Sequence, residues 1–203
     1  MKTNISISQA DPNSLVGAKL NLMAVGDMAH SIVGSSKQSI ADATFRMLWK
    51  SKNNRFSHEF AYEAKMGDQS LGMITCLPIT VLEKLASSTA KQLFSYRKLG
   101  LITYNLLHPK ALFTTLTLKE GFEGEYHIAT LAAMPESRGM GIGSQLIQHA
   151  EEQAIKQGYN LSSLTVKKEN HLAAKLYAKL GYEITSEIVK PTVSLYRMVK
   201  KLK

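Results

Sequence analysis

The chain has 203 residues, a net charge of +9 and a single cysteine, Cys76, and 44% of its residues are hydrophobic. This ordinary composition argues against a disordered or collagen-like chain, and one cysteine excludes an internal disulfide framework and a cysteine-rich metal site. The longest stretch without acidic or basic residues, Gln69–Leu82, is too short to cross a membrane. The polar N-terminal residues do not resemble a signal peptide. We therefore expect a cytoplasmic protein without a membrane contact.

The excess positive charge has two readings. It can attract an anionic ligand, either a nucleic acid or a phosphorylated cofactor, or it can simply keep the surface soluble. No motif that combines aromatic and basic residues supports nucleic-acid binding. We therefore expect no nucleic-acid partner.

The first 123 residues predict a few elements. Ser39–Lys50 places its apolar residues on one helical face. Glu59–Lys65 and Ser70–Cys76 alternate as two strands of a hairpin around a turn that contains Gly67. The region 77–123 mixes helical patterns with apolar runs, and we expect a variable, mostly helical insertion there.

The rest of the chain alternates strands and helices more clearly. Tyr126–Met134 is an apolar run typical of a buried strand, and a helical stripe begins at Ile142 and ends near Gly158. A strand at 161–166, a helix at 172–180 and strands at 182–186 and 193–199 follow. This order predicts an α/β (α+β) fold in which a βαβ unit carries antiparallel additions to a mixed sheet.

Between the first of these strands and its helix stands Arg138-Gly139-Met140-Gly141-Ile142-Gly143. Glycines let the backbone turn sharply and approach a ligand closely. The first N–H groups of the following helix have no intrahelical partner, and they lie at the positive end of the helix dipole. Such a turn is a cradle for phosphate oxygens. The alternative is a tight turn that needs glycine for its conformation alone.

The cradle matches neither common nucleotide motif. No lysine precedes Ser144, as a P-loop requires, and Ser144 stands where a dinucleotide fingerprint has its third glycine. The segment resembles instead motif A of the GNAT superfamily of N-acetyltransferases, Arg/Gln-x-x-Gly-x-Gly/Ala. Asn170-x-x-Ala173-x-x-Leu176-Tyr177-x-x-x-Gly181-Tyr182 resembles the superfamily's motif B, at the expected distance downstream.

The resemblance implies a single GNAT-like domain over 1–203, with an acetyl-CoA-binding core at 124–186. It implies a mostly antiparallel central sheet flanked by helices, with two strands splayed apart to admit the cofactor arm. It also implies acetyl-CoA as co-substrate, with no metal. By resemblance the cofactor is bound by Leu131, Ala133, Met134, Arg138, Gly139, Met140, Gly141, Ile142, Gly143, Ser144, Asn170, Ala173 and Tyr177.

The catalytic residues implied by the resemblance each have a second reading. Tyr177 takes the position of the general acid that protonates the leaving thiolate, but it also lies on an apolar helical face. A positioned proton donor contributes roughly 10²–10⁴-fold to a rate. Glu125 and His127 are both candidates for the base that takes a proton from the amine, and strand periodicity points them the same way. The alternatives are a surface carboxylate at the start of the strand for Glu125 and a structural histidine for His127. Asn170 suits a helix N-cap as well as a cofactor contact.

The resemblance implies direct transfer of an acetyl group to a primary amine in a ternary complex. The alternative is a non-catalytic acyl-CoA-binding module on the same fold. The acceptor is a small molecule or a peptide amine, and a homodimer is left open. Because the chain is basic and its expected acceptor segments hold few acids, we expect polycations such as spermine to be poor acceptors. Those acids are Asp27, Asp42, Glu59, Glu83, Glu120 and Glu123.

Overall fold

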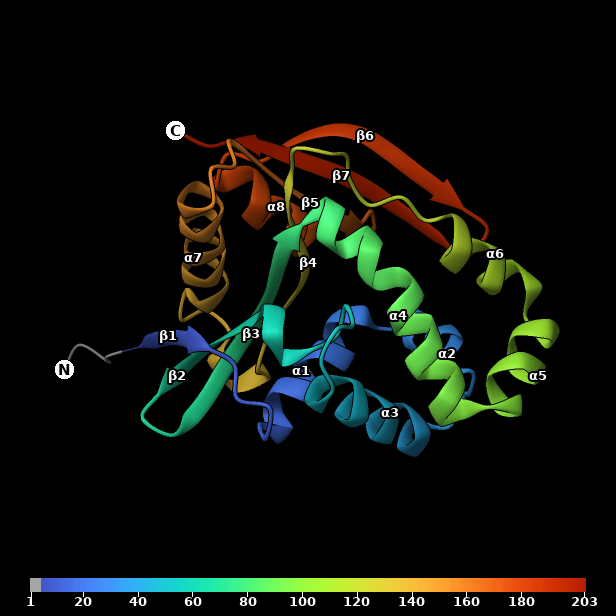
Figure 1. Ribbon diagram of the computed structural model, residues 1–203. Coiled ribbons are helices and arrows are strands. Elements are labelled where there is room, and N and C mark those ends of the chain that lie inside the picture. Colours follow the sequence, from blue (N-terminus) through green and yellow to red (C-terminus); the bar gives the residue numbers. More distant parts are fainter. Residues whose placement is uncertain (1–4) are drawn as a thin grey trace.

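The computed structural model describes residues 5–203, which form one seven-stranded sheet with helices on both faces (Figure 1). The strand order is β1-β2-β3-β4-β5-β7-β6. The strands are β1 (Ser6–Gln9), β2 (Ala61–Met66), β3 (Gln69–Pro78), β4 (Tyr126–Ala133), β5 (Leu161–Lys167), β6 (Glu183–Lys190) and β7 (Val193–Lys201).

The helices are α1 (Leu15–Val25), α2 (Met28–Val33), α3 (Gln38–Lys50), α4 (Ile79–Arg97), α5 (Leu99–Leu107), α6 (Pro109–Thr117), α7 (Ile142–Lys156) and α8 (His171–Lys179). No helix within residues 5–203 is both long enough and apolar enough to span a bilayer.

The sheet is mostly antiparallel, as predicted. Within the described sheet only β4 and β5 run parallel, and α7 connects them as the crossover of a βαβ unit. The predicted mixed α/β architecture is therefore confirmed. The hairpin differs in one detail, since β2 begins at Ala61 rather than at Glu59. His58–Phe60 forms a 3-10 turn instead, and the Ser57 hydroxyl caps it by accepting the Glu59 N–H.

The sequence pattern predicts neither β1 nor the first two helices. Helix α1 is apolar around its circumference, so it has no polar face to reveal a helical period. It begins where the Ser14 hydroxyl accepts the Gly17 N–H at 3.0 Å. Gly17 needs its hydrogen side chain, because a Cβ there would lie 2.3 Å from the Trp49 ring. Tertiary packing therefore holds α1 in place.

The sheet is covered on both faces. The apolar stripe of α7, including Leu146, Ile147 and Ala150, packs with Tyr177 of α8 into the largest core. Helix α1 covers β3 and β4 on the opposite face, where Leu20 and Trp49 are buried. Helices α2, α4, α5 and α6 gather beyond the sheet, at the right of Figure 1.

The parallel strands separate partway along their length. Their pairing consists of Tyr126 with Ser162, His127 with Ser163 and Ile128 with Leu164, and β4 pairs only with β3 beyond this point. Strand β5 continues to Lys167 with β7 as its partner. The predicted splayed strand pair is therefore present, and the gap opens beyond Ile128.

Candidate active site

The glycine turn stands at the mouth of this gap. Gly139 and Gly141 have φ angles of +80° and +75°, which side chains rarely adopt. A Cβ on Gly139 would meet no protein atom within 4 Å, and one on Gly141 would reach only the Gln145 amide nitrogen at 4.0 Å. The turn is thus open to solvent and presents backbone rather than side chains. Arg138 and Met140 are exposed beside it.

The next three residues, Ile142, Gly143 and Ser144, differ in their surroundings. The Ile142 side chain is 2% exposed and belongs to the core, so only its backbone faces outward at the start of α7. Gly143 lets α7 approach α8, because a Cβ there would lie 3.2 Å from Leu176 Cδ2. Ser144 is half-buried in the first helical turn. This first turn has backbone N–H groups without intrahelical partners, which can bind an anion.

The edge of β4 that faces the gap has unpaired backbone groups. The Met134 N–H donates to the Leu71 carbonyl at 2.8 Å, so Met134 faces β3. Neighbouring residues of a strand direct their backbone groups to opposite edges. Leu131 and Ala133 therefore direct theirs toward β5, where the pairing has already ended. An extended ligand arm can pair with these two residues but not with the Met134 N–H.

Asn170 caps α8, and its side-chain oxygen accepts the Ala173 N–H at 3.2 Å. Its N-cap reading is therefore confirmed. Asn170 also lines the cavity described next, so its amide nitrogen is available to a ligand there. Ala173 is half-buried and packs against the core.

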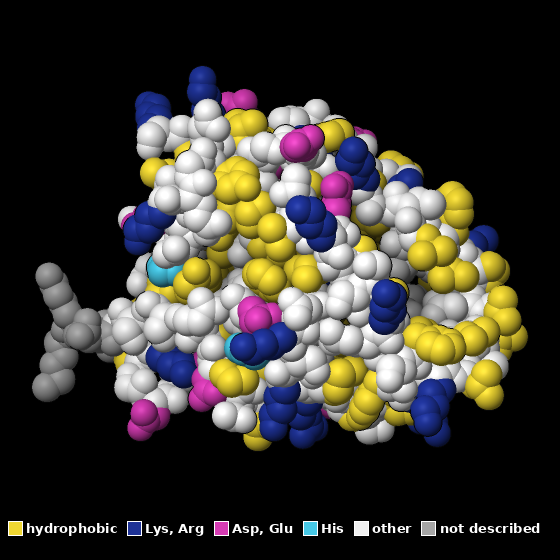
Figure 2. Space-filling view, viewed as in Figure 1, with side chains coloured by type: hydrophobic (Ala, Val, Ile, Leu, Met, Phe, Trp, Pro, Cys, Tyr) yellow, Lys and Arg dark blue, Asp and Glu magenta, His cyan; other side chains and the backbone are white. Residues whose placement is uncertain are grey.

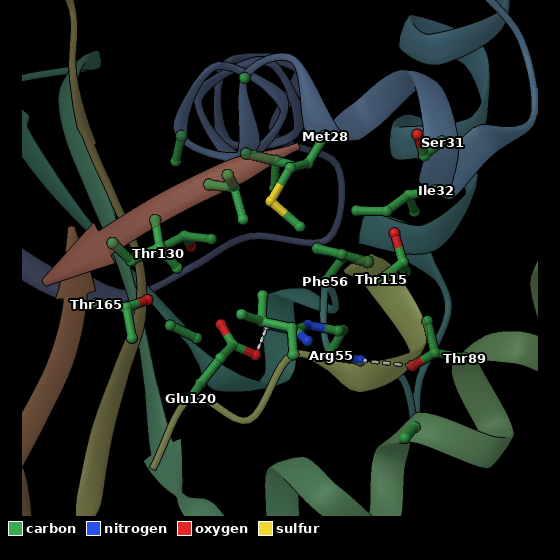
Figure 3. A pocket seen from close by; sticks show the side chains of 18 of the residues that line it. Met28, Ser31, Ile32, Arg55, Phe56, Thr89, Thr115, Glu120, Thr130 and Thr165 are labelled. Carbon is green, nitrogen blue, oxygen red and sulfur yellow. Dashed lines mark hydrogen bonds and ion pairs between the residues drawn. The ribbon is translucent and has the colours of Figure 1, made fainter. Parts of the chain in front are cut away.

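The gap leads into a cavity of about 820 Å³ (Figure 3). One part of its wall comes from the separated ends of β4 and β5, with Leu131 and Thr165 among the lining residues. Helices α2, α4, α5 and α6 form much of the remaining wall, and the end of α1, α8 and the start of β7 contribute the rest of it together with short connecting segments. The region expected to accept a cofactor arm is therefore continuous with a chamber formed by the helices.

Tyr177 packs in the core, as its apolar helical face predicts, and it also lines this cavity. Its side chain is 8% exposed and packs edge-on against Tyr182, with ring centroids 6.2 Å apart. Within residues 5–203 its hydroxyl makes no hydrogen bond that would compete with a ligand. Burial raises the pKa of Tyr177 to about 12, so the hydroxyl keeps its proton at neutral pH.

Glu125 is buried away from the cavity, so its reading as a surface carboxylate is wrong. Its carboxylate pairs with the buried Arg197 guanidinium and accepts the Phe122 N–H at 3.1 Å. The pair joins β7 to the residue just before β4. Glu125 and His127 are both buried, but their contacts differ.

His127 is fully buried and lies next to Glu120, which lines the cavity. Its Nδ1 is 3.0 Å from the Ser163 hydroxyl, and its Nε2 has no hydrogen-bond partner within residues 5–203. Burial lowers the pKa of His127 to about 4, even though the nearby Glu120 acts in the opposite direction. The imidazole is therefore neutral near pH 7.

Glu120 is the one carboxylate on the cavity wall, and the sequence motifs do not single it out. Arg55 Nη2 donates to Glu120 Oε2 at 2.8 Å and keeps the pKa of this buried carboxyl below its usual value, although burial acts to raise it. The other oxygen, Oε1, lies 4.0 Å from His127 Nε2. Figure 3 shows Glu120 and Arg55 side by side, with Thr89 next to Arg55. The only sequence signal for Glu120 is its place among the few acids of the helical region.

Thr130 belongs to the cavity wall, whereas Cys76 does not. Thr130 lines the cavity, and its buried hydroxyl has no partner among the described residues. Cys76 is 2% exposed within the core, and burial raises the pKa of its thiol to about 12. A buried, protonated thiol is not a nucleophile, in agreement with its expected core role. Within the described residues no group of three His, Cys, Asp or Glu side chains is placed to hold a metal ion.

Comparison with known proteins shows the family. The family model for the acetyltransferase (GNAT) family matches residues 38–182, more than half of the chain. The chain belongs to the GNAT family. This GNAT protein is 43% identical over 68 residues to an uncharacterised N-acetyltransferase of Methanocaldococcus jannaschii. It is 32% identical over 85 residues to the uncharacterised N-acetyltransferase YobR of Bacillus subtilis. These matches cover 34% and 42% of the chain, and 28% and 34% of the two relatives.

Solved structures share the GNAT fold over nearly the whole chain. An N-acetyltransferase from Staphylococcus aureus Mu50 aligns with a TM-score of 0.74 at 21% identity, covering 96% of this chain and 99% of that one. The PaiA N-acetyltransferase of Thermoplasma acidophilum, solved in complex with coenzyme A, aligns with a TM-score of 0.55 at 14% identity, covering 98% and 99%. At these identities the likeness concerns the fold. It confirms the predicted architecture.

Proposed function

We propose that this GNAT protein transfers an acetyl group from acetyl-CoA to a primary amine, directly and within a ternary complex. One observation carries the proposal. The gap between β4 and β5 opens into a cavity that has a protonated tyrosine, Tyr177, and an ionised carboxylate, Glu120, on its walls. Such a cavity brings a proton donor and a proton acceptor to the end of a cofactor channel.

The glycine turn fits the pyrophosphate of acetyl-CoA. The space beside Gly139 and Gly141 is open, and Arg138 adds a positive charge at the rim. The backbone of Met140, Ile142, Gly143 and Ser144 completes this cradle at the N-terminus of α7. The backbone of Leu131 and Ala133 and the side chains of Asn170, Ala173 and Tyr177 would contact the arm. Met134 would contribute through its side chain, since its N–H is bonded to Leu71.

Two groups act on the reacting atoms in this proposal. The Leu131 N–H, directed into the gap, polarises the thioester carbonyl by donating a hydrogen bond to its oxygen. The Tyr177 hydroxyl donates a hydrogen bond to the sulfur as the thiolate leaves. CoA supplies the acetyl group and the leaving thiolate.

We assign removal of the amine proton to Glu120, and we assign to His127 the role of a second basic group next to this carboxylate. Glu120 Oε1 faces the unpartnered His127 Nε2 at 4.0 Å, so a proton accepted by the carboxylate has a second basic atom nearby. Arg55 keeps Glu120 ionised and therefore able to accept a proton. Glu125 holds Arg197 in this proposal and acts on the site only by anchoring β4.

The domain proposal follows from the same arrangement. We propose a single domain over 1–203, with 124–186 as the cofactor-binding core. The insertion at 77–123 supplies α4, α5 and α6, which build the acceptor half of the cavity.

Substitution of Gly141 tests cofactor binding. Gly141→Asp adds a side chain and a negative charge where the pyrophosphate would lie, so acetyl-CoA should no longer raise the melting temperature. Gly67→Asp is the matched control, because Gly67 also has a positive φ and open space but lies in the β2–β3 turn. Equal cofactor stabilisation in both folded variants would contradict the proposed cradle.

Substitution of Glu120 distinguishes the enzyme from a non-catalytic acyl-CoA-binding module. Glu120→Gln should lower kcat by roughly 10²–10⁴, the range for a positioned acid or base, and leave the acetyl-CoA affinity unchanged. Acetyl-CoA binding by the wild-type protein without release of free thiol, across a wide set of amines, would favour the module.

A further inference from the structure

The acceptor half of the cavity is apolar. Figure 3 shows Met28 and Ile32 across the cavity from Glu120. Leu93, Leu101 and Leu112 add apolar side chains from α4, α5 and α6. A chamber of this composition gains free energy by removing apolar surface from water.

Three polar side chains of this chamber, one each from α4, α5 and α6, are already engaged. Thr89 and Thr115 each donate to the carbonyl four residues earlier in their own helix. The Asn105 amide donates to the carbonyls of Leu101 and Ser31, at 2.9 and 3.2 Å. These three groups leave little hydrogen-bonding capacity for a polar ligand. The unpartnered Thr130 hydroxyl lies on the β4 side of the cavity.

The charges on the lining match one ammonium group. The charged side chains that line the cavity are Arg55, Lys167 and Glu120. Arg55 already occupies Glu120 Oε2, and Lys167 pairs outward with Asp27 at 3.0 Å. Glu120 Oε1 is therefore the one carboxylate oxygen that remains for a cationic ligand. Further positive charges would lie unpaired among apolar side chains, which is costly.

The rim continues the apolar lining to the surface. Leu106 of α5 and Leu116 of α6 both line the cavity and are 70% and 75% exposed. Figure 2 shows hydrophobic side chains gathered at the right, where Figure 1 places α5 and α6. Exposed leucines on both sides of the cavity allow an apolar ligand to enter without crossing a polar collar.

From these observations we infer that the acceptor is a mono-amine with a bulky apolar body, such as a long alkylamine or an arylalkylamine. This inference rests on the proposed acetyl transfer. The amine nitrogen lies at Glu120 Oε1, next to the end of the cofactor channel, and the apolar body extends among α2, α4, α5 and α6 toward Leu106 and Leu116. Burial of the body supplies binding free energy that a polyamine cannot obtain.

The test measures kcat/KM with acetyl-CoA for linear primary amines from propylamine to octylamine, and for spermine. Each methylene contributes about 0.8 kcal/mol when buried, so kcat/KM should rise about fourfold per methylene until the cavity is filled. Spermine should be a poorer acceptor than octylamine. A flat series, or a preference for spermine, would overturn the inference while the proposed acetyl transfer stands.

A pair of variants locates the apolar body. Ala90 of α4 lines the cavity, whereas Ser87 of the same helix is exposed and does not. Ala90→Trp should fill part of the chamber and exclude about three methylenes, which lowers kcat/KM for octylamine about fiftyfold. Propylamine should be little affected, and Ser87→Trp should behave as wild type. Equal effects of Ala90→Trp on both amines would contradict this placement.

Two further results of these assays would overturn the inference in different ways. Octanoyl-CoA used in preference to acetyl-CoA with a short amine would show that the chamber holds the acyl chain, which overturns the inference. Stabilisation by acetyl-CoA without turnover of any amine would overturn both this inference and the proposed transfer, although cofactor binding would stand.

Discussion

Replacing Tyr177 by phenylalanine tests how the leaving thiolate is stabilised. Tyr177 has a pKa of about 12, whereas a thiol has a pKa of about 8.5. Complete proton transfer from this tyrosine to a thiolate is then uphill by ~5 kcal/mol, at 1.36 kcal/mol per pKa unit. The hydroxyl therefore acts chiefly as a hydrogen-bond donor to the sulfur.

A hydrogen bond to a charged group contributes about 1.5–3 kcal/mol, so we expect Tyr177→Phe to lower kcat about 10- to 150-fold. Most of this range lies below the roughly 10²–10⁴-fold effect of positioned proton transfer. Acetyl-CoA affinity should change little, because the ring remains packed against Tyr182. The assay follows free thiol under saturating acetyl-CoA and an acceptor from the alkylamine series.

Tyr182→Phe is the matched control, since Tyr182 is also buried but bonds Ser162 and does not line the cavity. The Tyr182→Phe variant should have the kcat of the wild-type protein. A Tyr177→Phe variant with unchanged kcat would show that water or another group stabilises the thiolate. A loss of cofactor affinity equal to the loss of kcat would show that Tyr177 acts through packing.

Three further predictions concern buried titratable groups. The pKa of His127 is about 4 when folded and about 6.5 when unfolded, so the unfolded state binds more protons between these values and stability falls with acidification. Between pH 7 and pH 5 the free energy of unfolding, measured by urea denaturation, should fall by about 2 kcal/mol because of His127. His127→Gln should make the free energy of unfolding less dependent on pH. The same pH dependence in the variant and the wild type would refute the low pKa of His127. Arg197→Met leaves Glu125 buried without its partner and should destabilise the fold by about 3–5 kcal/mol. Adding Glu125→Met should recover much of this loss. Equal stability of the single and double variants would show that the pair is not coupled. Because its thiol is buried and protonated, Cys76 should resist alkylation at pH 7.5 in the native protein. For the same reason Cys76→Ala should leave kcat within about twofold of wild type. Detection of an acetylated Cys76 by mass spectrometry would contradict direct transfer.

The sequence predicts the cofactor half of this protein because that half depends on local rules. Gly139 and Gly141 adopt positive φ at a strand-to-helix junction, and this requirement can be read from residue type alone. The stripe that begins at Ile142 and the apolar run that begins at Tyr126 have the periods of a helix and of a buried strand. The fold class and the GNAT family are accordingly confirmed.

The acceptor half depends on contacts between residues far apart in the chain. Arg55 and Glu120 stand 65 positions apart and pair in the cavity, and His127 directs Nε2 toward the same carboxylate. Glu125, two residues from His127, turns instead to Arg197. Strand periodicity assigns both residues to one side, but it does not determine which partner each side chain meets.

The sequence by itself determined the family, the mixed sheet and the glycine turn, since periodicity and glycine content act over a few neighbouring residues. Tertiary structure alone decided that the chamber is apolar and that Glu120 is its one carboxylate. The physical reason is that α2, α4, α5 and α6 each carry apolar side chains, and only their packing determines which of these face a shared cavity, which face the core and which, like Leu106 and Leu116, remain exposed at the rim.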